Sequence, residues 1–89
     1  MSKKDFLRII DEGVERRRYF MVVKIETEGN PAPEIIINPA ENFSQKIRYY
    51  DKSYNDHMEL IKAKEAGKVI RVMDVLMTSN LNDLAWFAY

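Results

Sequence analysis

The segment NPAENFSQKIRYYDKSYNDHMELIKAKEAG, which begins at Asn38, constrains the fold more than any other part of the chain. Its large apolar side chains are separated by four, three, four, four and three residues, the spacing that gathers side chains on one face of an α-helix. Asn38 is a favoured cap residue, Pro39 suits the first helical position, and Glu41 can complete a capping box. Gly67 lies just past the expected end. We therefore expect a helix from Asn38 to Ala66 with one buried stripe: Phe43, Ile47, Tyr50, Tyr54, Met58 and Ile61.

Alternating side chains outside this helix predict strands. From Arg18 to Glu26 the apolar residues recur at every second position, and EIIIN at 34–38 resumes the pattern with β-branched residues. The stretch EGNPAP between them holds one glycine and two prolines, which interrupt a ladder and predict a loose hairpin connection. KVIRVMDVLMTS at 68–79 alternates again and predicts a third strand.

Short helices are expected at both ends of the chain. Ser2 can cap the first, and Gly13 can end it in a left-handed conformation. Ser79 or Asn80 can cap the last. The expected fold is α+β, in one domain of residues 1–89, with a three-stranded sheet and α-β-β-α-β-α order. One long helix is expected to pack across one face of the sheet. The other face of the sheet must then be covered by the two end helices or by another subunit.

Composition limits the classes of function. The 14 basic and 14 acidic side chains give a formal net charge of zero, which removes the general attraction to DNA, RNA or an anionic membrane. The chain has no cysteine, so disulfides, thiolate metal sites and cysteine nucleophiles are excluded. No apolar run reaches the roughly 18 residues of a membrane span, and MSKKDFLRII is unlike a signal peptide. We expect a cytoplasmic protein without a cofactor or a membrane partner, for which general nucleic-acid binding is unfavourable.

His57 and Glu59 form an H-x-E pattern, which supplies a ligand and a general acid/base in zinc deaminases. The cysteine ligands of such a site are absent, and one histidine cannot build the usual three-ligand metal site. Ser53 and His57 are four residues apart on the expected helix, but Asp56 projects about 100° away and cannot orient the ring as a triad acid does. We therefore expect no enzyme activity and no metal site, and interpret these residues as a polar flank of the helix.

Arg16, Arg17 and Arg18 form the main basic cluster of the sequence. In an alternating segment Arg17 would point away from the other two, so the three cannot make one flat phosphate platform. They are candidate ligand residues nonetheless. Local ion pairs are the alternative, with these acidic residues as partners: Asp11, Glu12 and Glu15.

Tyr49 lies off the apolar stripe, with Lys46 three residues before it and Lys52 three residues after it. A ring between two cations suits a stacked base and its phosphates, so these residues are also candidate ligand residues. An ordinary solvated face with lysines lying along the surface is the alternative. A further alternative is that Tyr49 and Leu60, which lie on one flank of the helix, belong to a second interface.

The segment NLNDLAWFAY holds more aromatic surface than one side of a short helix can bury. Leu81, Leu84 and Ala85 fall on one side, which Trp86 and Phe87 cannot share completely. Exposed aromatic patches commonly mark interfaces, so we expect a homo-oligomer, with a dimer as its simplest form. Packing of the rings in the monomer core is the alternative. The candidate interface residues are Leu81, Leu84, Trp86, Phe87 and Tyr89.

The stretch ENFSQKIRYYDKSYNDHMELIKAKEAGKVIRVMD, from Glu41 to Asp74, resembles a pattern in small uncharacterised proteins of Gram-positive bacterial phages and prophages. In that pattern an E-N-F opening and a Y-Y-x-x-x-Y-(N/D)-D run precede a lysine-rich helix end and a strand. Small phage proteins of this size often act by binding, including inhibition of host-defence enzymes and capture of nucleotide signals. The matching residues are Glu41, Asn42, Phe43, Tyr49, Tyr50, Tyr54, Asn55 and Asp56.

Residues and resemblance together predict a non-enzymatic, phage-type accessory binding protein. One version is a host-defence antagonist that sequesters a nucleotide signal, with Tyr49 stacking on the base and nearby cations holding the phosphate. An inhibitor that binds a host protein is one alternative. A small nucleic-acid-binding protein or a purely structural oligomeric protein is another.

Overall fold

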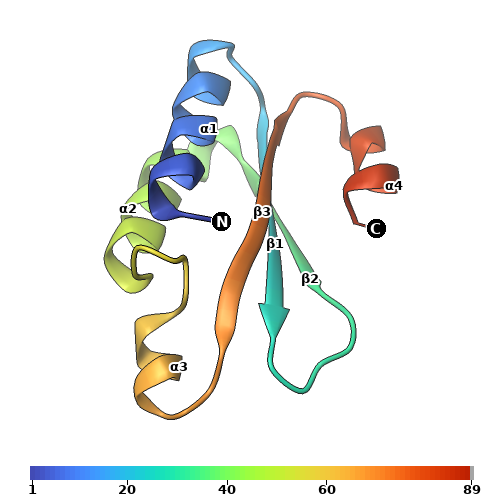
Figure 1. Ribbon diagram of the computed structural model, residues 1–89. Coiled ribbons are helices and arrows are strands. Elements are labelled where there is room, and N and C mark those ends of the chain that lie inside the picture. The colour runs from blue at the N-terminus through green and yellow to red at the C-terminus, as the bar shows by residue number, and fades with distance from the viewer. Residues whose placement is uncertain (89) are drawn as a thin grey trace.

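The computed structural model describes residues 1–88 and has the expected α+β fold (Figure 1). The sheet is antiparallel and three-stranded, in the order β2-β1-β3. The strands are β1 (Phe20–Thr27), β2 (Glu34–Pro39) and β3 (Ile70–Thr78). The helices are α1 (Lys3–Glu15), α2 (Phe43–Ser53), α3 (Ile61–Glu65) and α4 (Leu84–Phe87), and single 3-10 turns precede two of them: η1 (Ala40–Asn42) and η2 (Leu81–Asp83). The elements follow the order α-β-β-α-β-α, in which the second helical region consists of two helices, α2 and α3.

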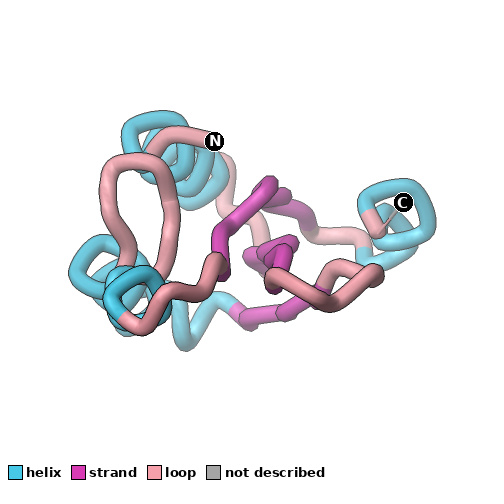
Figure 2. The backbone as a smooth tube through the Cα atoms, turned by 60° about the horizontal axis from the view of Figure 1, so that its bottom comes forward, coloured by secondary structure: helices cyan, strands magenta, loops and turns pink. Residues whose placement is uncertain are grey.

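Helices cover the two faces of the sheet unequally. α1, α2 and α3 lie on one side of the sheet and α4 lies on the other (Figure 2). Alternate β1 residues Met21, Val23 and Ile25 face the larger group, because they belong to the core that the helices contribute to. The main helical members of that core are Phe6 and Ile10 from α1 and Phe43 and Tyr50 from α2.

The start of α1 agrees with the sequence prediction, but its end does not. Gly13 is buried inside the helix, where any Cβ would collide with Cβ and Cγ of Met77 on β3. The left-handed position falls on Arg17, whose φ is 57°. The N–H of Arg18 donates to Gly13 O (3.0 Å) and the N–H of Arg17 to Val14 O (3.0 Å), the pair of bonds that defines a Schellman motif. The glycine therefore permits close packing and does not end the helix.

The prediction of one helix from Asn38 to Ala66 is wrong at its beginning. Asn38 and Pro39 belong to β2, opposite Met21 and Phe20, and Asn38 Nδ2 donates a hydrogen bond to Met21 O (3.3 Å). The chain turns through η1, so α2 begins at Phe43 without a side-chain cap. Pairing with β1 satisfies the Asn38 backbone in a sheet, and this outweighs the local capping preference.

The same prediction is wrong in the middle, because the chain leaves the helix at Tyr54, whose backbone is extended (φ −114°, ψ 146°). The N–H of Leu60 donates to Ile70 O (2.8 Å), and the N–H of Val72 donates to Met58 O (2.9 Å). Residues 58–60 thus cover the outer edge of β3, which would otherwise be unpaired. Tyr54 and Met58 stay buried as predicted, but Ile61, predicted to be buried, is 37% exposed.

The C-terminal segment divides its two described rings between core and solvent. Asn80 caps η2 as expected, since its side chain accepts a hydrogen bond from the N–H of Asn82 (3.0 Å). Phe87 is buried (4% exposed) and its carbonyl accepts a hydrogen bond from Lys24 Nζ (3.3 Å). Trp86 is 60% exposed and meets the Phe87 ring edge-on, with 6.0 Å between centroids.

The predicted interface residues therefore do not form one exposed group. Trp86 and Leu81 are exposed, Leu84 is half-buried and Phe87 is buried. Tyr89 lies outside the described residues. Among the helices of residues 1–88, none has the length and apolar character needed to cross a membrane.

Candidate functional site

The predicted ligand residues fall into separate parts of the surface. Tyr49 and Lys52 line a recess between α2 and α3, which we call the Tyr49 groove. Arg17 and Arg18 line a recess between the end of α1 and the start of α2, which we call the arginine groove. Arg16 borders neither, and lines a smaller recess between α1 and β3.

The Tyr49 groove exists because α2 stops at Ser53. In one continuous helix, residues 49 and 62 would be about 20 Å apart along the axis at 1.5 Å per residue. The turn at 54–60 instead reverses the chain and sets α3 beside the end of α2, enclosing about 660 Å³. Its lining is Tyr49, Lys52, Ser53, Leu60, Ile61, Lys62 and Glu65.

The turn is held by one side chain, Asn55. Its Oδ1 accepts hydrogen bonds from the N–H groups of His57 (2.9 Å) and Glu59 (3.0 Å), and its Nδ2 donates to the Glu59 carboxylate (3.0 Å). Lys64 Nζ lies 2.9 Å from the same carboxylate. The Lys64 hydrogen bond and then the Asn55 hydrogen bond hold the pKa of Glu59 below its ordinary value. Met58 follows with a left-handed backbone (φ 57°), completing the reversal.

Tyr49 is half-exposed (44%) and fixed by neighbouring rings. Its ring meets Tyr50 edge-on at 5.1 Å and Tyr54 at 6.1 Å between centroids, and Lys46 Nζ is 5.6 Å from its centroid. Burial, followed by the proximity of Tyr49, raises the pKa of Tyr50 to about 12 and also raises the pKa of Tyr54. Both buried hydroxyls are therefore neutral at ordinary pH.

Lys46 contacts the Tyr49 ring and is not part of the groove lining, whereas Lys62, which we did not single out in the sequence, lines it opposite the end of α2. Within residues 1–88, no carboxylate lies within ion-pair distance of Lys52 or Lys62. Finding Lys62 from sequence required knowing that the chain leaves the helix at Tyr54, which helical periodicity does not reveal.

The residues considered for catalysis are not arranged as on the expected helix. Ser53 is the last residue of α2 and lines the Tyr49 groove, while Asp56 and His57 are exposed in the turn that follows. The Glu59 carboxylate accepts hydrogen bonds from Lys64 and Asn55. Over the described part of the chain, no three His, Cys, Asp or Glu side chains are grouped so that they could hold a metal ion.

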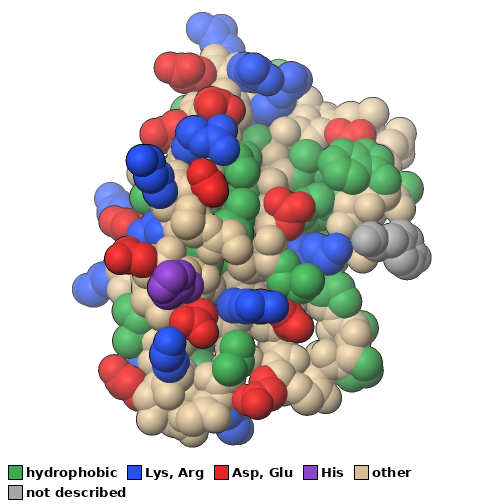
Figure 3. Space-filling model, in the orientation of Figure 1, with side chains coloured by type: hydrophobic (Ala, Val, Ile, Leu, Met, Phe, Trp, Pro, Cys, Tyr) green, Lys and Arg blue, Asp and Glu red, His purple; other side chains and the backbone are tan. Residues whose placement is uncertain are grey.

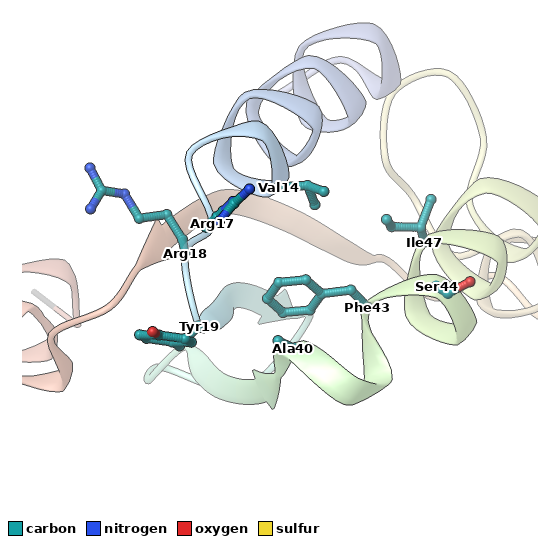
Figure 4. A pocket seen from close by; sticks show the side chains of 8 residues that line it. All are labelled: Val14, Arg17, Arg18, Tyr19, Ala40, Phe43, Ser44 and Ile47. Atoms are coloured by element: carbon teal, nitrogen blue, oxygen red, sulfur yellow. The ribbon is translucent and has the colours of Figure 1, made fainter.

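The arginine groove encloses about 490 Å³ (Figure 4). Its lining is mainly apolar, and Ser44 adds a hydroxyl. The apolar lining residues are Val14, Ala40, Phe43 and Ile47. Tyr19, whose sequence pattern predicted only a place in a strand, stands at the edge and is 64% exposed. It directly precedes β1.

The predicted ion pairs of the arginine cluster are wrong. Glu12 pairs with Arg8 (3.2 Å), which also lies 3.7 Å from Asp5. In residues 1–88 no carboxylate comes within ion-pair distance of Arg16, Arg17 or Arg18. Contrary to expectation, the three arginines do not belong to an alternating strand. They lie in the turn that follows the end of α1 at Glu15, and this turn sets the directions in which their side chains leave the backbone.

The face shown in Figure 3 carries no broad patch of one charge, because acidic and basic side chains alternate over the helices. Hydrophobic side chains gather instead over α4 on the right of that view. Exposed Trp86 belongs to this element.

Comparison of the chain with protein-family models, with curated proteins and with solved structures found no match.

Proposed function

We propose that this protein is a non-enzymatic binding protein that captures a phosphorylated nucleotide in the Tyr49 groove. The observation that carries the proposal is the meeting of a half-exposed aromatic ring with Lys52 and Lys62 in one recess. Stacking on a tyrosine and contact with cations are the two interactions that nucleotide binding commonly combines.

Each side chain that lines the groove complements one part of a nucleotide. The base packs on the exposed side of Tyr49, and the phosphate lies near the lysine ammonium groups, which no described carboxylate neutralises. Ser53 and Glu65 supply a hydroxyl and a carboxylate for donors on the base edge. Leu60 and Ile61 cover the apolar part of the sugar and base.

The biological setting follows from the resemblance of residues 41–74 to small phage proteins. In that setting the protein is a cytoplasmic host-defence antagonist that sequesters a nucleotide signal without altering it. Ser53 ends α2 whereas Asp56 and His57 are exposed in the turn that follows, and this arrangement supports binding without turnover.

Inhibition of a host protein is the second candidate function. Trp86 and Leu81, exposed on the α4 side of the sheet, favour it, because exposed aromatic and aliphatic side chains are common anchors for a protein partner.

Calorimetry with cyclic and linear nucleotides tests the first function. At least one ligand is expected to bind, and Tyr49→Ala is expected to weaken it about tenfold or more, since stacking on one base is worth about 1–3 kcal/mol. Lys52→Gln and Lys62→Gln are expected to weaken binding and to reduce its salt dependence. Trp86→Ala removes an exposed ring outside both grooves and is the matched control.

Absence of binding across the panel, or equal affinity of the parent and Tyr49→Ala, contradicts nucleotide capture in this groove. A host-protein complex lost on Trp86→Ala would then favour the second function.

A further inference from the structure

The arginine groove is independent of the Tyr49 groove, since the two share no lining residue. Figure 4 shows Phe43 at its centre, with Tyr19 and Ala40 below it, Val14 above it and Ile47 to its right. The Arg18 side chain extends away from Phe43 at the outer end of the recess, beyond Tyr19. Val14 is exposed although it is apolar, so the recess presents apolar surface to solvent. An occupant would gain by covering that surface.

The cations of the groove are free to bind an anion. No carboxylate lines the recess, and none among residues 1–88 lies within ion-pair distance of Arg17 or Arg18. Guanidinium groups bind phosphates and carboxylates through paired, charge-assisted hydrogen bonds. Ser44 adds a hydroxyl donor.

Arg17 occupies a backbone position that disfavours arginine. It is the left-handed residue of the Schellman motif, where glycine is the usual choice because any Cβ is crowded. An arginine at this position trades stability of the turn for a guanidinium at the groove, a pattern typical of functional sites.

The lining differs from that of the Tyr49 groove in having no carboxylate to accept hydrogen bonds from a base edge. It combines an apolar floor, an exposed Tyr19 ring and cations. Charge complementarity and apolar lining together select a ligand that joins an aromatic body to an anionic group. We infer that the arginine groove is a second binding site, for small aromatic phosphates or carboxylates.

The test uses 1-naphthyl phosphate and 1-naphthoate as probes, followed by calorimetry and by amide chemical shifts in NMR spectra. Both probes are expected to shift amides around Arg17–Tyr19 and Phe43–Ser44. Inorganic phosphate and 1-naphthol, which carry the anion or the ring alone, are expected to bind about tenfold more weakly or worse. If either fragment binds as tightly as the joined probes, the inferred ligand class is wrong.

Arg17→Gly separates binding from folding. Glycine relieves the left-handed backbone, so the variant is expected to melt a few degrees above the parent, while its affinity for both probes falls about tenfold. Arg18→Gln is expected to weaken binding similarly. Arg48→Gln, an exposed arginine on α2 outside the groove lining, is the control and is expected to bind like the parent.

Unchanged affinity in both Arg17→Gly and Arg18→Gln, or shifts confined to other regions, overturns the inference. Tyr49→Ala distinguishes it from nucleotide capture: the amide shifts at the arginine groove must persist in that variant. Their persistence while nucleotides fail to bind at Tyr49 would support this site and contradict the other. If both probes shift only amides around Tyr49, the second site does not exist.

Discussion

The Tyr49 groove and the arginine groove lie at opposite ends of α2 and arise in different ways. At the C-terminal end, the chain leaves the helix at Tyr54 because residues 58–60 pair with the edge of β3. At the N-terminal end, the groove borders the Schellman motif that ends α1. One groove thus depends on long-range sheet pairing and the other on a local helix terminus packed beside α2.

This difference predicts that mutations can damage one groove and spare the other. The turn at 54–60 supports the Tyr49 groove, and the contact between Gly13 and Met77 supports the position of the arginine groove. Both grooves still depend on the shared core beneath α2.

Tyr54→Ala is expected to have the largest effect, destabilising the protein by about 3–5 kcal/mol, because it truncates a buried ring that packs against Tyr50 and Tyr49. Urea unfolding followed by circular dichroism measures this loss. Tyr54→Phe keeps the ring and is the control. A loss below about 1 kcal/mol in Tyr54→Ala would mean that the ring is not a core member, because buried aromatic truncations typically cost more.

Gly13→Ala is expected to destabilise by about 1–3 kcal/mol, since the new Cβ must displace Met77 or move α1 away from β3. Amide shifts should change around the arginine groove and remain parent-like around Tyr49. Combining it with Met77→Ala should cost less than the sum of the two single changes, because the collision is removed. Additive losses in this double-mutant cycle would show that the two residues are not in contact.

Asn55→Ala is expected to cost about 1–2 kcal/mol, because the N–H groups of His57 and Glu59 lose their acceptor. Affinity at the Tyr49 groove should fall, and affinity of the arginine groove for 1-naphthyl phosphate should not change. Asn55→Asp keeps the acceptor for both N–H groups but sets a second carboxylate against that of Glu59, so it should recover only part of the lost stability. Equal effects on both grooves would contradict their separate origin.

Trp86→Ala is expected to have the smallest effect on folding, below about 1 kcal/mol, since the ring is 60% exposed. The same variant tests a prediction that does not concern the grooves, namely that the protein forms a homo-oligomer. Light scattering should show fewer subunits in the variant than in the parent if the exposed ring joins copies of the chain. The same subunit count in both proteins would exclude Trp86 as an essential contact.

Most of the fold follows from local patterns. Period-two alternation correctly predicted the strands, and cap residues at Ser2 and Asn80 correctly marked helix starts, because these features depend on neighbours in the chain. The pairing of Tyr49 with Lys52 in one recess also follows from spacing on α2. Lys62 and Tyr19 could not be assigned to sites in this way, since their surroundings come from distant segments.

The sequence by itself determined which segments are strands, the order of the elements and the apolar character of Phe43, Tyr50, Tyr54 and Met58. Tertiary structure decided where helical geometry stops. Periodicity at 54–61 is compatible with a helix, but hydrogen bonds to the unpaired edge of β3 compete with those within a helix and prevail here. It also decided the role of Gly13, because only packing against Met77 reveals why a side chain cannot fit there.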